Sequence, residues 1–337
     1  MNINRREMIA GLFAASATAG LSAEPPKTLE KEEVGTDQTG SADNITFKKT
    51  GLDQLRKKLD ARGKICGVEL SRIILGGNPF GGWAHCRDLS YVNTLVKAYN
   101  THEKIMETFR MCEEAGINAF LSNPALAFYF QDYRKLGGKM KFISDCGHKE
   151  GVVVGARQSV EAGASLIYAH GFTTDKWMAE NDWQAGETAL KEMRKLGVPV
   201  GLGAHSFKTM KFLVEHDLIP DFWMKTIHPT DYWSFQKDPR DDGEGEPGAE
   251  QRGWHDNCWC RDPEALAAWF EKREEPWIAF KTMAAGAVPP KKAVPFAFEH
   301  GADYICMGMM DFQVVENVNI ATEALGRGFP NRKRKWH

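Results

Sequence analysis

The sequence predicts an α/β protein folded as an eight-stranded β/α barrel, the TIM barrel, and three observations support this fold class. Short runs rich in β-branched and aromatic residues alternate with longer runs whose apolar residues recur every three or four positions, and eight such pairs follow one another within residues 51–330. Helical runs end at glycine, for example at Gly116 and Gly197, as left-handed helix caps require. The length of 337 residues accommodates a barrel of about 250 residues with extensions.

The expected strands are short and follow one another with a helix between each pair, as in residues 103–114 and 186–196. The strands are expected at residues 72–77, 118–122, 141–145, 165–170, 199–205, 222–228, 277–281 and 304–309. Two connections are long: residues 78–101 after the first strand and residues 231–261 after the sixth. Both follow the carboxyl end of a strand, which is the face where barrel enzymes place their active sites.

The amino-terminal residues differ from the rest of the chain. Arg5 and Arg6 precede a short apolar stretch, which is typical of a secretory signal peptide, and the paired arginines resemble the twin-arginine export signal. We expect residues 1–23 to be a signal peptide of the twin-arginine kind and the mature protein to be periplasmic or otherwise extracytoplasmic. The alternatives are an ordinary secretory signal and a membrane anchor, although the apolar run is short for spanning a bilayer. Residues 24–50 contain few large apolar side chains and are expected to be a flexible linker. Residues 331–337 are expected to be a solvated basic tail.

Charge and cysteine content narrow the class of partner. The 43 Lys and Arg residues nearly balance the 45 Asp and Glu residues, which gives no general attraction for nucleic acid or an anionic membrane. We therefore expect a small-molecule substrate, no nucleic-acid partner and no stable membrane association after signal cleavage. The 7 cysteines are odd in number and scattered, so they do not predict a disulfide framework. The sequence gives no indication of the oligomeric state.

Several loose motifs, in order, resemble the aldo/keto reductases. Residues 69–82 resemble the opening of that family, and residues 116–118, 166–170, 190–207 and 308–317 resemble its second, fourth, fifth and last units. The resemblance covers the chain from about residue 60. It implies a TIM barrel and reduction of carbonyls by NADPH, with an Asp, Tyr, Lys and His tetrad at the strand ends.

Most of the tetrad that the resemblance implies is replaced in this sequence. His170 lies where the family has its catalytic histidine, but the aspartate position falls on residues 121–122, Tyr129 is no secure equivalent of the tyrosine, and the lysine position falls among residues 144–146. Residues 309–312 also lack the Arg or Lys that would bind a 2′-phosphate. Proton donation to a carbonyl by the Tyr and Lys route is therefore not expected.

Histidines end three consecutive strands of the predicted barrel, at His170, His205 and His228, and the third strand is followed by Asp145 and His148. Neighbouring strands lie about 4.8 Å apart, so imidazoles at matching heights would converge. Imidazole and carboxylate ligands suit Zn, Mn or Fe, and we predict a divalent metal centre of His170, His205, His228 and Asp145. A metal-free acid/base site made of the same histidines, or purely structural histidines, are the alternatives.

Other residues are candidates for substrate contacts. Lys281 ends the seventh strand and is a candidate clamp, proton donor or Schiff-base amine, with a structural salt bridge as the alternative. Asn78 would orient a substrate hydroxyl, or serve only as a turn residue. Trp233, Trp254 and Trp259 in the second long connection would stack on a sugar, or simply anchor the loop.

Together these features predict an exported barrel enzyme whose histidine-rich site acts on a small carbohydrate-like or carbonyl substrate as an isomerase, lyase or hydrolase. A metal would bind the substrate oxygen, and His170, Asp145, His148 and Lys281 are the candidate catalytic residues, one of the last three moving the proton. One alternative is a divergent NADP-dependent reductase in which His170 or Lys281 replaces the missing tyrosine. Another is a non-catalytic barrel that binds a solute.

Overall fold

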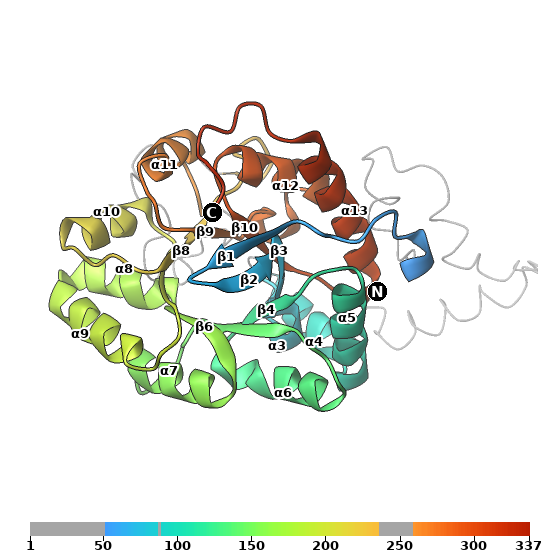
Figure 1. The fold of residues 1–337 in the computed structure, drawn as a ribbon, viewed down its shortest axis with the longest axis horizontal. Helices are drawn as coiled ribbons and strands as arrows, with labels where there is room; N and C mark the ends of the chain where they lie inside the picture. The colour runs from blue at the N-terminus through green and yellow to red at the C-terminus, as the bar shows by residue number, and fades with distance from the viewer. Residues whose placement is uncertain (1–50, 87–88, 236–258) are drawn as a thin grey trace, which may run out of the picture. The chain divides into compact units, whose positions relative to one another are not determined.

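The computed structural model describes residues 51–86, 89–235 and 259–337. The signal peptide, the linker and Trp254 lie outside these residues. Within them, eight parallel strands close into a barrel in the order β10-β3-β4-β5-β6-β7-β8-β9, which confirms the predicted fold class (Figure 1). The strands are β3 (Ile73–Gly76), β4 (Ala119–Ser122), β5 (Lys141–Ser144), β6 (Ala164–Ala169), β7 (Val200–Ala204), β8 (Phe222–Thr226), β9 (Trp277–Phe280) and β10 (Tyr304–Gly308). Each agrees with a predicted strand to within a few residues.

Helices surround the barrel and connect successive strands (Figure 1). They are α3 (Asn78–Gly81), α4 (Tyr91–Tyr99), α5 (His102–Glu114), α6 (Ala127–Lys135), α7 (Val152–Glu161), α8 (Gly171–Glu180), α9 (Trp183–Arg194), α10 (Phe207–Glu215), α11 (Pro263–Phe270), α12 (Pro290–Glu299) and α13 (Asp311–Arg327), with short 3-10 turns η1 (Leu52–Gln54), η2 (Pro124–Leu126) and η4 (Ala284–Gly286). Polar caps start several of them, because an oxygen of Thr101, Ser206 or Asp262 accepts a backbone N–H of the first turn.

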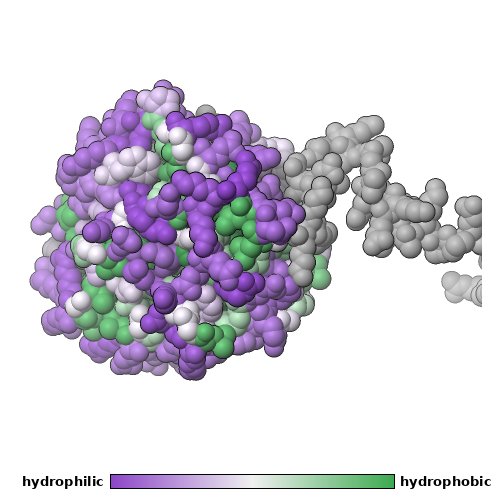
Figure 2. Space-filling model, turned by 45° about the vertical axis from the view of Figure 1, so that its right-hand side comes forward, coloured by the Kyte–Doolittle hydropathy of each residue, from purple (hydrophilic) through white to green (hydrophobic). Residues whose placement is uncertain are grey.

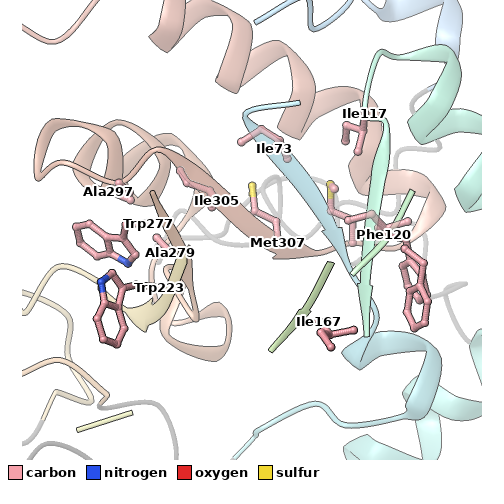
Figure 3. Close-up of a cluster of buried hydrophobic side chains, with 14 of the residues drawn as sticks. Ile73, Ile117, Phe120, Ile167, Trp223, Trp277, Ala279, Ala297, Ile305 and Met307 are labelled. Carbon is pink, nitrogen blue, oxygen red and sulfur yellow. The ribbon is translucent and has the colours of Figure 1, made fainter. Parts of the chain in front are cut away.

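Side chains alternate along each strand between two apolar layers. One layer fills the barrel lumen, with members such as Ile74, Ile143 and Met224. The other lies between strands and helices, where Trp223 pairs in register with Trp277 and Figure 3 shows both beside Ala279 and Ala297. Because both faces of a parallel sheet are buried, the strands read as continuous apolar runs, which is the pattern the sequence shows.

An antiparallel hairpin that the sequence analysis did not predict precedes the barrel. Its strands are β1 (Arg62–Ile65) and β2 (Val68–Ser71), joined through Cys66 and Gly67, both at positive φ. Ile65 and Leu70 belong to the same apolar cluster as the lumen residues. The hairpin therefore covers the amino-terminal end of the barrel (Figure 1).

The prediction that residues 331–337 form a solvated basic tail is wrong, because Arg332 and Arg334 are buried against Asp303. Arg332 donates to Asp303 Oδ1 at 3.0 Å, and Arg334 pairs with Asp303 Oδ2, while the Asp303 side chain is 0% exposed. The Trp336 ring lies under Arg332, whose Cζ is 3.7 Å from the ring centroid. Only the fold shows that Asp303, at the start of β10, is buried and needs these charges.

The outer surface is mainly hydrophilic, with separate hydrophobic patches on the face that Figure 2 shows. Helix α4, in the first long connection, contains no buried residue, and its Tyr91 and Leu95 are 60% and 59% exposed. Across the described ranges, none of the helices has both the length and the apolar content needed to cross a membrane.

The network around Asp303 predicts a large stability effect at Arg334. Replacing Arg334 with Ala leaves a buried carboxylate with one fewer cation, so Arg334→Ala should lower the free energy of unfolding by about 3 kcal/mol in urea titrations. Lys333, whose side chain is 75% exposed, gives the matched control. Lys333→Ala should change stability by less than about 0.5 kcal/mol, and equal effects of the two substitutions would contradict the assignment.

Candidate functional site

The candidate site lies at the carboxyl ends of the barrel strands, where the lumen changes from apolar to polar. Tyr168, Phe280 and Cys306 belong to the uppermost apolar layer of the lumen. The residues that follow the strands are largely polar, and among them His205 follows β7 and Lys281 follows β9. An apolar base below convergent polar groups is the arrangement typical of a binding site for a small molecule.

A buried pair formed by Asp175 and His205 is the centre of this site. The Asp175 Oδ2 lies 2.9 Å from Nδ1 of His205, and the two residues are 1% and 7% exposed. Asp175 belongs to α8, and the first residue of that helix, Gly171, packs on the imidazole so closely that an added Cβ would lie 2.8 Å from Nδ1. The glycine therefore permits the helix to bring its carboxylate behind the ring.

Three further donors surround the carboxylate of Asp175. They are the backbone N–H groups of His205 and Ser206, at 3.2 and 3.3 Å, and the hydroxyl of Thr209, at 2.7 Å. Backbone N–H groups can only donate, so these contacts favour the ionised carboxylate, which has the most lone pairs to accept them. Nδ1 of His205 is then assigned as the fourth donor, because it faces the same carboxylate.

Burial sets the protonation of both groups. It raises the pKa of Asp175 to about 7, although the Thr209 hydroxyl and the backbone N–H groups oppose the rise. Burial also lowers the pKa of His205 well below its ordinary value, and positive charge from Lys281 and His170 lowers it further. His205 is therefore neutral near pH 7. Its Nε2, on the opposite edge of the ring from Asp175, presents a lone pair and forms no hydrogen bond within the described part of the chain.

Trp259 forms the wall beside His205. Its ring centroid lies 4.8 Å from that of His205 and 6.2 Å from that of His85, and the Nζ of Lys281 lies 3.3 Å from its centre. Lys281 and His85 both have left-handed backbones, with φ of 55° and 49°. Such conformations are costly for residues other than glycine and cluster at functional sites. Of the predicted tryptophans, Trp259 lies against His205, whereas Trp233 is 82% exposed.

His170 lies on the other side of His205, with 5.5 Å between the two ring centroids. Its Nδ1 accepts the backbone N–H of Phe172 at 3.1 Å and caps α8. In the neutral ring that bond places the proton on Nε2, which makes Nε2 a hydrogen-bond donor. The structure therefore brings His170 and His205 together at neighbouring strand ends.

His228 is a structural residue, and its prediction as a metal ligand is wrong. Its Nδ1 lies 2.8 Å from the carbonyl oxygen of Pro229, and its Nε2 accepts the backbone N–H groups of Trp259 and Cys260, at 2.8 and 3.0 Å. Both ring nitrogens are thus used to fix the return of the second long connection. His228 therefore positions Trp259, whose backbone N–H it binds directly.

Asp145 and His148 are held by local turns. Asp145 Oδ1 accepts the backbone N–H of Gly147 and the amide of Asn123. His148 Nδ1 accepts the backbone N–H of Glu150 at 3.1 Å, and its Nε2 lies 3.4 Å from the amide nitrogen of Gln158 in α7.

The predicted four-ligand metal centre is not formed by the described residues, among which no three His, Cys, Asp or Glu side chains are arranged to hold a metal ion. Whether the protein binds a divalent metal stays a prediction. Asn78 is exposed at the end of β3, as a substrate-binding role requires, and its backbone oxygen accepts the N–H of Trp83.

Two important residues were missed by the sequence analysis. Asp175 lies within a helix, where an acid is ordinarily solvated, and its only signal is that it follows His170 by five positions. Lys225 is fully buried, and its Nζ donates to the Thr226 hydroxyl at 2.7 Å. It also contributes positive charge near Asp175 and His205. A lysine inside a strand of apolar residues was a visible sign of a buried polar network.

No protein-family model matches this chain, and no curated protein is detectably similar to it. Among solved structures, it is similar to a proposed aldo-keto reductase from Pseudomonas aeruginosa, with a TM-score of 0.53 and 17% identity over 82% of this chain and 100% of that one. A second structure of a proposed aldo-keto reductase from that organism gives 0.52 and 16% over 82% and 100% of the two chains. At such identities the likeness defines the class of fold, an aldo/keto reductase-like TIM barrel, and nothing about the activity.

The buried imidazole of His228 predicts acid-sensitive stability. Burial lowers the pKa of His228 from 6.5 to about 4. Between these values the unfolded chain binds a proton that the folded chain does not, so the free energy of unfolding should fall by about 3 kcal/mol from this residue as the pH drops from 6.5 to 4.

His228→Gln keeps an acceptor for the two N–H groups but cannot titrate. The stability of the variant, measured by urea unfolding at each pH, should fall by about 3 kcal/mol less than that of the wild type over this interval. Parallel curves for the two proteins would show that His228 does not titrate in this way.

Proposed function

We propose that this barrel is an enzyme that transfers a proton on a small carbohydrate-like or carbonyl substrate, as an isomerase or a lyase. The proposal is supported chiefly by the neutral imidazole of His205, whose Nδ1 is bound to a buried carboxylate and whose Nε2 lone pair lies at the carboxyl ends of the strands. A histidine oriented in this manner is a general base matched to neutral pH.

In this mechanism Nε2 of His205 takes the proton from a carbon next to a substrate carbonyl. The imidazolium that forms is stabilised by Asp175, and the electron pair moves to the carbonyl oxygen. The Nε2–H of His170 would donate a hydrogen bond to that oxygen, where negative charge develops. When the deprotonated carbon carries a hydroxyl, that hydroxyl passes its proton to the first carbonyl oxygen and becomes the new carbonyl, and return of the first proton to the former carbonyl carbon completes an isomerisation. When the next carbon carries a hydroxyl, transfer of the proton to that oxygen lets it depart as water, the electron pair forms a carbon–carbon double bond, and the carbonyl is restored, which completes an elimination. No step in this scheme uses a metal.

NADP-dependent reduction is the second candidate, supported by the likeness in fold to aldo-keto reductases. We propose that the tetrad of that family is not retained. Tyr129 lies in α6, is 7% exposed and contacts the rings of Phe80 and Phe128. At the start of α13 the carboxylate of Asp311 binds Lys104 at 2.8 Å, so an anionic side chain occupies the segment where the family would bind a phosphate.

Export remains part of the proposal and rests on Arg5 and Arg6 with the apolar stretch that follows them. An address outside the cytoplasm favours chemistry that consumes no NADPH, because that cofactor is regenerated inside the cell. Proton transfer satisfies this condition, whereas reduction does not.

Exchange of substrate hydrogen for deuterium tests the function without knowledge of the product. The purified chain would be incubated in D₂O with a panel of sugars, sugar acids and oxo acids, and deuterium on carbon followed by NMR. Substrate exchange should fall at least about 100-fold in His205→Gln, because the general base is removed. His216→Gln is the control, since that histidine follows α10 and stacks on Trp183 with 5.3 Å between the ring centroids, and it should retain the rate.

Absence of exchange with every compound, together with saturable NADPH binding, would favour the reductase. Tight binding of a sugar without exchange or turnover would favour a solute-binding barrel. Equal losses in the two histidine variants would indicate that His205 has no special role.

The rate should rise with pH because the active pair contains ionised Asp175. Burial raises the pKa of Asp175 to about 7. Below that value the fraction of carboxylate, and with it kcat/KM for exchange, should fall tenfold per pH unit, and above it kcat/KM should level off. The residual activity of Asp175→Asn should lack this inflection, and an unchanged profile in the variant would assign the titration to another group.

A further inference from the structure

Nitrogen-bearing side chains gather around His205. Lys281 lies over the ring of Trp259, and His85 meets the same ring edge-on. His170 lies beside His205, and Lys225 is buried behind it. These groups come from four different strand ends and loops, so the closure of the barrel, and not local sequence, assembles them.

The position of the Lys281 ammonium is fixed on two sides. Its backbone is left-handed, at φ 55°, directly after β9, and its carbonyl accepts the N–H of Ala284 to close a turn. Its Nζ lies 3.3 Å from the centre of the Trp259 ring. The backbone of Trp259 is fixed in turn, because its backbone N–H and that of Cys260 donate to Nε2 of His228. A flexible lysine that is held in this way loses little further entropy when it binds a ligand.

Within the described ranges, neither Asp175 nor Asp145 offers the substrate a carboxylate at His205. Asp175 is 1% exposed, and its oxygens accept from His205, Ser206 and Thr209. Asp145 follows β5, and its Oδ1 binds Asn123 and Gly147. The wall formed by His205, Trp259 and Lys281 is therefore lined by aromatic and cationic groups.

The surroundings of His205 give an independent reason to expect a negatively charged ligand. Its side chain is more than nine-tenths buried, and its Nε2 has no hydrogen-bond partner among the residues that the structure describes. Surrounding positive charge disfavours the imidazolium that a general base must form. A negative charge supplied by the substrate would offset this repulsion and make His205 a stronger base in the complex than in the free protein.

We propose that the substrate of this site is an anion, a carboxylate or a phosphate ester, whose charged group binds Lys281 beside the carbon from which His205 removes the proton. The inference rests on the proposed function for the role of His205, but the anion site at Lys281 exists independently of turnover. Sugar acids and sugar phosphates are the carbohydrates that have this chemistry. The Lys281 ammonium, held over the Trp259 ring, can bind a carboxylate or a phosphate because it acts as a point charge.

Calorimetric titration with small probes tests the anion site directly. Inorganic phosphate, acetate and uncharged glycerol would each be titrated into the full chain and into Lys281→Gln. At least one of the two anions should bind, and its Kd should rise at least about tenfold in the variant, a loss of about 1.4 kcal/mol. Preference for phosphate would identify a phosphate ester as the natural group, and preference for acetate a carboxylate.

Two variants control for fold and for charge in general. Lys281→Arg keeps the cation and should retain binding within about threefold, whereas Lys211→Gln removes a lysine that lies 4.2 Å over the Phe207 ring on α10, away from the site, and should bind as the wild type does. Failure of both anions to bind, glycerol binding as tightly as the anions, or unchanged affinity in Lys281→Gln would each overturn the inference.

The outcome is separable from that of the exchange experiment. His205→Gln should keep the anion affinity, so binding that depends on Lys281 without any exchange would leave the anion site standing and remove the catalytic proposal. Exchange into neutral sugars at a rate that Lys281→Gln does not change would leave the catalytic proposal standing and remove the anion site.

Discussion

Closure of eight parallel strands into a barrel is the constraint on which the rest of this molecule depends. Closure buries both faces of every strand, so the lumen and the layer under the helices must both be apolar. It also brings all eight carboxyl ends to one rim. Residues as distant in sequence as His85, Asp145, His205 and Lys281 follow strands or lie in loops of that rim.

The two ends of the barrel differ in how they handle charge. At the amino end, Asp303 is neutralised by Arg332 and Arg334, and the hairpin β1 and β2 covers the lumen. At the carboxyl end, burial raises the pKa of Asp175 and lowers that of His205. Lys281 keeps a left-handed backbone there. The first end satisfies its charges and stabilises the fold, whereas the second retains strain and a lone pair that a ligand can use.

The histidines show how identical residues at equivalent positions acquire different roles. His228 binds backbone on both sides of its ring and fixes a loop, His170 caps a helix, and His205 is oriented by Asp175. Each follows a neighbouring strand. What distinguishes them is which backbone or carboxylate reaches each ring, and that depends on the loops and helices that pack above the barrel.

The sequence by itself determined the barrel, its eight strands and the end at which the site lies, because apolar periodicity and glycine caps are local signals. It also located His170, His205 and Lys281 at one rim. It did not predict the pair of Asp175 with His205 or the burial of Arg332 and Arg334 against Asp303. It also placed His228 in a metal centre, whereas the ring of His228 binds backbone groups. Those outcomes depend on contacts between residues 29 or more positions apart, such as the bonds of Arg332 with Asp303 and of Asp175 with His205. Only tertiary packing decides which polar residues meet and which of them are buried away from water.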